Sequence, residues 1–173
     1  MGLYICAIDS TCEVTNVVDS VINIRCGVRV NSVLDMVIKV SNRVKNEKIS
    51  KLVICGHGTP GQQGVGCGQE FTLDNAEKFL GVDMFTDKLY GTAENYMPLL
   101  RPKFEPNAIV SLNGCRTGVG PSGDRLLKRL ALILGVQVEA TADQKQNLIP
   151  GYEGMVKRCD SNSCFILPAA WFH

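Results

Sequence analysis

The sequence predicts an α/β protein with a mainly parallel central sheet. Segments with the 3.6-residue apolar period of helices, clearest at 32–48 and 122–134, alternate with strand-like runs. Because strands that alternate with helices are joined by right-handed crossovers, the sheet is expected to be mostly parallel. The length of 173 residues fits a single domain, 1–173. Three apolar runs, at 3–8, 51–56 and 108–112, have the length and composition of strands that are covered on both faces, and residues 136–140 are predicted to form a fourth strand.

Local signals mark the ends of the two clearest helices. Ser32 can cap the first helix, and Asp35 stands at the third helical position, where a negative charge favours the helix dipole. Leucines at 126, 127, 130 and 134 share one face of the second helix. Gly135 follows its last turn and is expected to end it, since glycine readily adopts the left-handed conformation found there.

The remaining segments are less regular. Residues 13–30 are rich in valine and isoleucine and are predicted to hold a helical turn and a short strand. Thr72 is expected to cap a short helix that includes Leu80, and an irregular helix is expected around 94–100. The tail at 155–167 carries two apolar stretches and is predicted to form a hairpin.

Charge and cysteine content exclude several classes of function. The net charge is +1 and no dense basic cluster occurs, so neither nucleic acid nor a membrane surface is an expected partner. Eight cysteines are present without a CxxC pair, which argues against zinc-ribbon and thioredoxin-like sites. The N-terminus has no signal-peptide pattern and no apolar run approaches the ~18 residues of a membrane span. We therefore expect a cytoplasmic protein with reduced thiols, with export by a signal-less route as the alternative.

Reactive residue types gather where three of the predicted strands end. In open α/β sheets the functional crevice lies beyond the carboxyl ends of the strands. That rule selects residues 9–11, then His57 with Gly58, then residues 113–115, which end in Cys115. The chain has two histidines and the other is residue 173, so imidazole chemistry is assigned to His57.

His57 and Cys115 also have an ordinary structural interpretation. A histidine at a strand end is often a satisfied polar residue, and most cysteines serve in packing. Here, however, each is the first reactive group after an apolar strand, and each has a glycine beside it. A thiol paired with an imidazole becomes a stronger nucleophile, because the thiolate is the attacking species. The joint placement favours a Cys–His dyad.

The two motifs resemble those of caspase-like (clan CD) cysteine peptidases. Residues 54–58, Ile-Cys-Gly-His-Gly, are similar to the strand–His–Gly motif, and residues 111–118, Ser-Leu-Asn-Gly-Cys-Arg-Thr-Gly, are similar to the strand-plus-cysteine motif. Cys115 follows His57 by 58 positions, close to the ~50 of caspases. The Gln-Ala-Cys signature of caspases proper is replaced here by Asn-Gly-Cys. The resemblance covers roughly residues 50–145 and is nearest to bacterial branches: CHAT peptidases, toxin autoprocessing domains and caspase-related domains of surface proteins.

The resemblance implies a fold, an activity and a set of roles. It implies a three-layer caspase-like fold, in which helices cover both faces of the sheet. It implies a thiol protease (a hydrolase) with Cys115 as nucleophile and His57 as general base, and an oxyanion hole made by the N–H groups of Gly58 and Cys115. Asp9 and Asp143 follow strands where a substrate-binding pocket is expected, and would favour a basic residue; the alternative is that both are turn residues.

No cofactor is implied. We expect a protein or peptide substrate and allow for a regulatory protein partner. Two other functions stay open. The fold can serve as a catalytically silent binding or interaction module, because function depends on site geometry and not on fold. A doubly wound module for a small ligand is the other, although no GxGxxG follows the first strand. The glycine-rich stretch 61–68 lacks the Lys-Ser/Thr ending of a phosphate loop and is expected to be a flap or hairpin beside the dyad.

Overall fold

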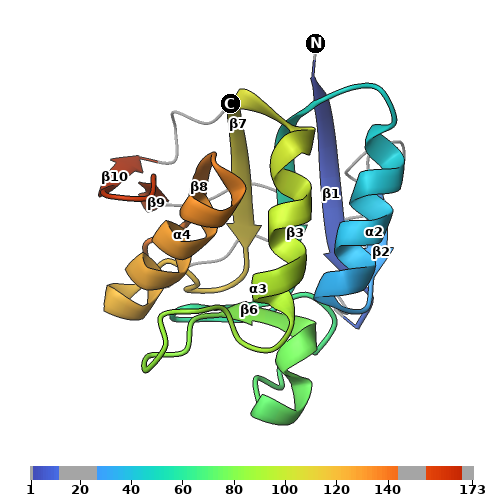
Figure 1. The fold of residues 1–173 in the computed structure, drawn as a ribbon. Coiled ribbons are helices and arrows are strands. Elements are labelled where there is room, and N and C mark those ends of the chain that lie inside the picture. The colour runs from blue at the N-terminus through green and yellow to red at the C-terminus, as the bar shows by residue number, and fades with distance from the viewer. Residues whose placement is uncertain (1, 12–26, 144–154, 169–173) are drawn as a thin grey trace.

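A seven-stranded sheet in the order β10-β9-β8-β7-β3-β1-β2 forms the centre of the protein (Figure 1). The computed structural model describes residues 2–11, 27–143 and 155–168. Strands β2, β1, β3, β7 and β8 run parallel, and β9 and β10 are antiparallel. The mainly parallel sheet and the C-terminal hairpin are thus confirmed. The strands are β1 (Leu3–Asp9), β2 (Gly27–Val30), β3 (Ile49–Cys55), β7 (Phe104–Asn113), β8 (Gln137–Thr141), β9 (Met155–Cys159) and β10 (Cys164–Pro168).

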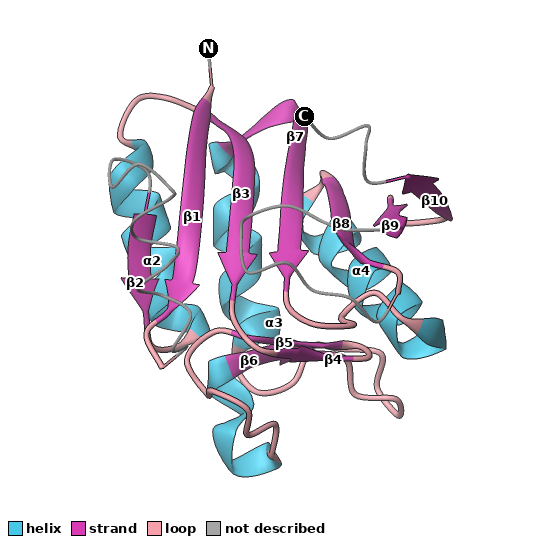
Figure 2. Cartoon of the chain, turned by 180° about the vertical axis from the view of Figure 1, so that it is seen from behind, coloured by secondary structure: helices cyan, strands magenta, loops and turns pink. Residues whose placement is uncertain are grey.

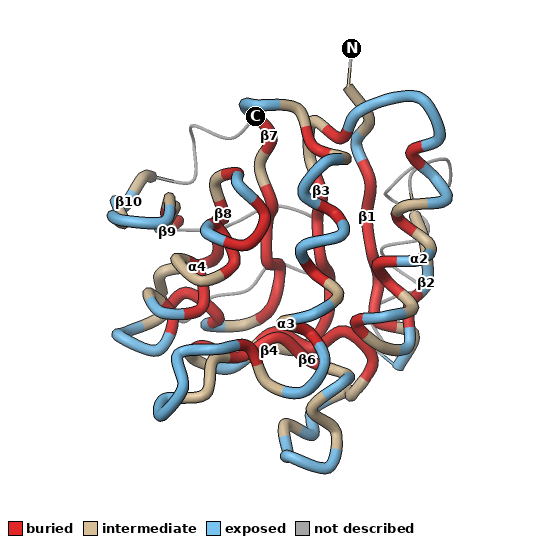
Figure 3. The backbone as a smooth tube through the Cα atoms, viewed as in Figure 1, coloured by how far each residue is buried: buried red, intermediate tan, exposed pale blue. Residues whose placement is uncertain are grey.

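Strand register brings the carboxyl ends of the central strands to one edge of the sheet. Ile8 of β1 pairs with Cys55 of β3, and Cys55 pairs with Asn113 of β7. All three strands therefore end at nearly the same level. Their central residues are buried, as Figure 3 shows for the middle of β1, β3 and β7. Continuous apolar sequences form these strands because both faces are covered.

The described helices pack on one face of the sheet, as Figures 1 and 2 show from opposite sides. They are α2 (Val33–Val44), α3 (Ala93–Tyr96), which continues into the 3₁₀ helix η2 (Met97–Lys103), and α4 (Gly120–Leu134). Alternate strand residues such as Ile54 and Leu112 join the helices in the main hydrophobic core. Helices on the second face are not seen in the described part of the chain, and most of the predicted segment 13–30 lies outside it.

The predicted start of α2 and the predicted end of α4 are confirmed, whereas α2 ends at Val44 rather than near residue 48 and α4 begins at Gly120, two residues before its predicted start. The Ser32 side chain accepts a hydrogen bond of 3.1 Å from the backbone N–H of Asp35, which satisfies a free donor of the first turn. At the other helix, Gly135 is left-handed with φ 71° and its N–H bonds the carbonyl of Ala131.

The short helix expected from Thr72 to Leu80 is partly wrong. A 3₁₀ helix, η1, spans Leu73–Lys78, and the Thr72 side chain makes no capping bond. Leu80 instead lies in β6 (Phe79–Gly81), which pairs with β5 (Gln62–Gly64). Leu80 is fully buried there, so burial and strand pairing outweigh its helix propensity.

The face of the sheet opposite the described helices carries a buried ionic cluster. The Glu139 carboxylate is fully buried and accepts bonds from Arg158 at 2.6 and 3.0 Å and from the Ser111 hydroxyl at 2.5 Å. The Nζ atom of Lys51 lies 3.5 Å from the Glu139 oxygen that Ser111 bonds, and Arg158 bonds the other oxygen. Since Ser111 and Arg158 are the register partners of Glu139, the cluster joins β7, β8 and β9.

The expectation that all thiols are reduced is wrong for one pair. Cys159 and Cys164 face each other on β9 and β10 and form a disulfide. Facing positions of an antiparallel pair lie close enough for such a bond. Within the described ranges, no helix is both long and apolar enough to cross a membrane.

Candidate active site

His57 follows the central strand β3 by two residues. Parallel neighbours on both sides of β3 explain its apolar sequence, which ends at Cys55. Gly56 then turns the chain, where a side chain would come within 2.5 Å of the Gly64 carbonyl oxygen. His57 is half-buried. The imidazole is therefore placed at the carboxyl edge of the sheet, as the sequence predicts.

Cys115 follows the neighbouring strand β7 in the same way. Asn113 ends β7 and its side-chain amide lies 3.8 Å from the sulfur of Cys55, which joins the ends of the two strands. Cys115 is half-buried. The next residue, Arg116, has a φ of 60°, a left-handed conformation that is costly for residues other than glycine and that the surrounding contacts must hold. The prediction that the two residues follow neighbouring parallel strands is confirmed.

The turns that carry His57 and Cys115 touch each other. A methyl group added to Gly58 would lie 2.8 Å from the carbonyl carbon of Gly114 and 2.9 Å from the nitrogen of Cys115. It would also overlap the Thr117 hydroxyl. A methyl group on Gly114 would in turn lie 3.0 Å from the α-carbon of Gly58. This close approach requires glycine on both sides and brings the two reactive positions together.

A small three-stranded sheet lies across the ends of β3 and β7, as Figure 2 shows. It consists of β4 (Gly58–Thr59), β5 and β6, so β4 begins directly after His57. The hairpin predicted for the glycine-rich stretch 61–68 is confirmed in part, because the β4–β5 hairpin spans residues 58–64 and leaves out residues 65–68. Because β4 begins at the residue after His57, the small sheet fixes the position of His57 at the end of β3.

Two buried polar residues that sequence reasoning missed hold this hairpin to the Cys115 turn. Thr117 is fully buried; its carbonyl accepts a 3.0 Å bond from Gly61, and its hydroxyl bonds the carbonyl of Gln62 at 3.2 Å. Gln63 is also fully buried, and its side-chain oxygen lies 3.4 Å from the Thr117 hydroxyl. The only sequence signal was their place within or beside the two motifs.

The hairpin geometry leaves one backbone donor of the predicted oxyanion hole available. Gly58 and Gln63 are register partners, and the Gly64 N–H bonds the His57 carbonyl at 2.8 Å. That bond makes Gly58–Gln63 a non-hydrogen-bonded pair of the ladder. The N–H of Gly58 therefore points away from β5. Gly58 itself lies against the Cys115 nitrogen, the second predicted donor, since a β-carbon added to Gly58 would come within 2.9 Å of it.

Asp9 and Asp143 lie on either side of the dyad. Asp9 ends β1, next to β3, and Asp143 follows β8, next to β7. Asp9 has no accessible surface, and one of its oxygens accepts bonds from the backbone and hydroxyl of Thr11. Its other oxygen has no hydrogen-bond partner among the described residues. Asp143 is half-buried and accepts a 3.1 Å bond from the Met155 N–H. Binding of a basic substrate group by Asp9 and Asp143 stays a prediction. At Asp9, which has no accessible surface, such binding requires the residues that cover the carboxylate to move.

The cysteines differ in their access to solvent and in their acidity. Cys6 and Cys55 are buried in the sheet. Burial raises the pKa of the half-buried Cys67 thiol to about 11, and the nearby charge of Asp9 adds to the rise. Cys67 is therefore a neutral, weakly nucleophilic thiol near pH 7. It provides an internal comparison for Cys115.

The alkylation rate of Cys67 is expected to follow its raised pKa. Because the thiolate is the reactive form, labelling at pH 8 should be about a hundredfold slower than for an unperturbed thiol, and should climb about tenfold per pH unit up to pH 11. Mass spectrometry of peptides labelled with iodoacetamide across this pH range measures it, and Cys67→Ser identifies the peptide. A plateau near pH 8.5 would contradict the assignment.

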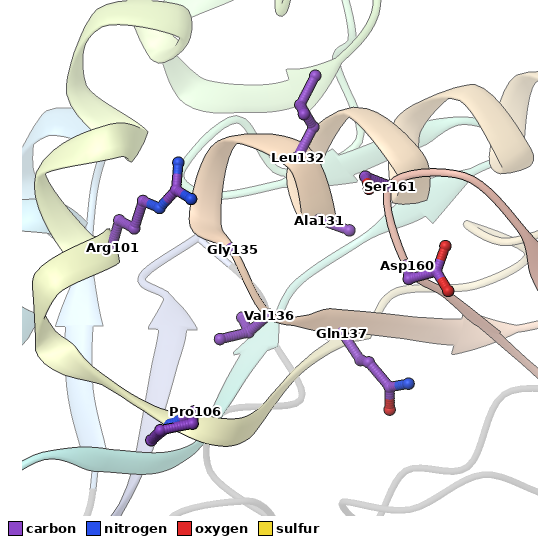
Figure 4. A pocket seen from close by; sticks show the side chains of 9 residues that line it. All are labelled: Arg101, Pro106, Ala131, Leu132, Gly135, Val136, Gln137, Asp160 and Ser161. Carbon is purple, nitrogen blue, oxygen red and sulfur yellow. The ribbon is translucent and has the colours of Figure 1, made fainter.

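A hollow of about 280 Å³ lies at the edge of the sheet opposite the Cys115 turn (Figure 4). Its walls include Pro106 near the start of β7, Gln137 at the start of β8, and Asp160 in the β9–β10 turn. It opens at the amino ends of strands whose carboxyl ends face Cys115, so it is no part of the dyad. Within residues 2–11, 27–143 and 155–168, no group of three or more His, Cys, Asp or Glu side chains is placed to hold a metal ion.

Comparison with known proteins adds nothing to this site: no family model, no curated protein and no solved structure matches the chain.

Proposed function

We propose that the chain is a cytoplasmic, caspase-like (clan CD) cysteine endopeptidase. The proposal includes a three-layer fold and a place among the bacterial branches of these peptidases. The contact between Gly58 and the Gly114–Cys115 peptide carries this proposal. It joins the two strand ends at which an imidazole and a thiol stand, and it does so at the carboxyl edge of a parallel sheet, where such folds hold their sites. A protein or peptide is the proposed substrate, and no cofactor takes part.

The proposed reaction uses four groups of the chain. The Cys115 thiol gives its proton to His57 as the sulfur attacks the carbonyl carbon of the scissile peptide. The N–H groups of Gly58 and Cys115 bind the oxyanion that forms. His57 then gives the proton to the leaving amine as the C–N bond breaks. Finally, His57 takes a proton from water, whose oxygen hydrolyses the thioester, and the carboxylic acid and the thiol are released.

A peptide-library digest tests the proposal, with Cys115→Ala as the inactive control. Cleavage by the unmodified chain and none by the variant is the expected result. The competing function is a catalytically silent binding module, in which His57 and Cys115 are retained but do not turn over substrate. It predicts peptides that bind but are never cut, so the digest separates the two.

Replacing Gly58 by alanine is expected to lower the rate of peptide cleavage about 10²–10³-fold, the typical cost of one lost oxyanion donor. The added methyl group meets backbone atoms of Gly114 and Cys115 that cannot rotate away, so the two turns must separate. Gly27→Ala is the matched control, because the one contact that its methyl group would make among the described residues is with Ile8 at an ordinary 3.5 Å. Equal kcat/KM for the two variants would contradict the assigned role.

A further inference from the structure

A cavity of about 290 Å³ lies beside the Cys115 turn on the side of α4. Gly61 and Ser122 form the wall next to the turn: Gly61 bonds the Thr117 carbonyl, and a methyl group added to it would lie 2.6 Å from the β-carbon of Ser122. Thr117 is two residues from Cys115. The cavity therefore begins where the candidate nucleophile's turn ends, and its volume suits one side chain with its backbone.

The rest of the lining is apolar with a single cation. Val82, Met84 and Pro121 are the apolar residues that line it, and Arg125 is the charged residue of the set. Among the described residues Arg125 has neither a hydrogen bond nor an ion pair, whereas Arg129, one turn along the same helix, is paired with Glu94. Asp83 adjoins the lining residues but turns its carboxylate to the N–H of Phe85 at 2.8 Å. No described acidic side chain lines the cavity.

We infer that this cavity binds an acidic side chain, aspartate or glutamate, of an extended peptide substrate, with Arg125 as the specificity-determining residue. A guanidinium without a counter-charge offers two parallel donors to a carboxylate. The apolar walls contact the methylene groups of the same side chain. The inference rests on the proposed function for the meaning of substrate, and it places the acidic residue on the α4 side of Cys115, away from Asp9.

Two peptide series that differ only by Glu or Gln at one position, scanned along the sequence, provide the test. At one position the unmodified chain is expected to favour Glu about tenfold or more in kcat/KM, as for a charge-assisted hydrogen bond. In Arg125→Gln this preference should fall to about twofold or less. Lys128→Gln removes the same charge from the same helix outside the cavity and should keep the preference.

The outcomes separate this inference from the proposed function. Cleavage without preference for Glu, or a preference unchanged in Arg125→Gln, overturns the inference and leaves the peptidase standing. If nothing is cleaved, the peptidase proposal fails. Fluorescence anisotropy then measures binding of the same peptides to the Cys115→Ala variant, which tests the role of the cavity separately. Tighter binding of the Glu peptide that is lost in the Cys115→Ala, Arg125→Gln double variant supports the inference, and equal binding overturns it.

Discussion

Replacing Cys115 by alanine is expected to abolish peptide cleavage, with a loss of at least about 10³-fold in kcat, and to leave the fold intact. The thiol is half-buried at the edge of the sheet, so its removal leaves no large cavity in the core. His57→Ala is expected to cost about as much, because a nucleophile and its base act as one unit. Single-turnover cleavage of a library-derived peptide measures both losses, and urea unfolding checks that stability is unchanged.

Thiol labelling provides a second, independent measurement of the dyad. Cys115 is expected to react with iodoacetamide faster than Cys67, whose pKa of about 11 keeps it protonated, and faster than the buried Cys55. His57→Ala should slow the labelling of Cys115 and leave that of Cys67 unchanged. Equal labelling of Cys115 in both forms of the protein would show that the imidazole does not activate the thiol.

Glu139→Gln is expected to lower the free energy of unfolding by about 3–5 kcal/mol. The variant keeps the shape of the side chain but leaves Arg158 and Lys51 without their buried counter-charge. The side chain of Arg158 is only 15% exposed, so water replaces little of the lost interaction. Because Ser111 belongs to the strand that leads to Cys115, loss of the cluster weakens the support of the candidate site. Urea denaturation, read as a shift of the midpoint at constant slope, measures the effect.

Glu94→Gln is the matched control for this prediction. The side chains of Arg129 and Glu94 are 25% and 21% exposed, so water screens this pair more than the fully buried Glu139, and its removal is expected to cost only about 1 kcal/mol. The same chemical change therefore has a small effect at one site and a large one at the other. A loss at Glu139 no greater than that at Glu94 would show that the buried cluster contributes little to stability.

The sequence alone was sufficient for features that depend on neighbours along the chain. Ser32 and Gly135 were identified as helix ends because capping involves only the adjacent turn. The central strands were identified because strands covered on both faces are continuously apolar. His57 and Cys115 were found by the same local logic, since each is the first reactive residue after such a strand.

Contacts between distant segments decided what the sequence could not show. Leu80 left its predicted helix because β5, sixteen residues or more upstream, offered it a strand partner and a buried place. The role of Thr117 depends on the hairpin at Gly61, and that of Glu139 on Arg158, which is 19 residues further along the chain, in the next strand. Cys159 and Cys164 looked like two more thiols until the antiparallel register set them face to face. Side-chain burial and strand pairing depend on which segments come into contact in the folded protein. A single sequence gives the residues of each segment but not the distant segment that each one contacts.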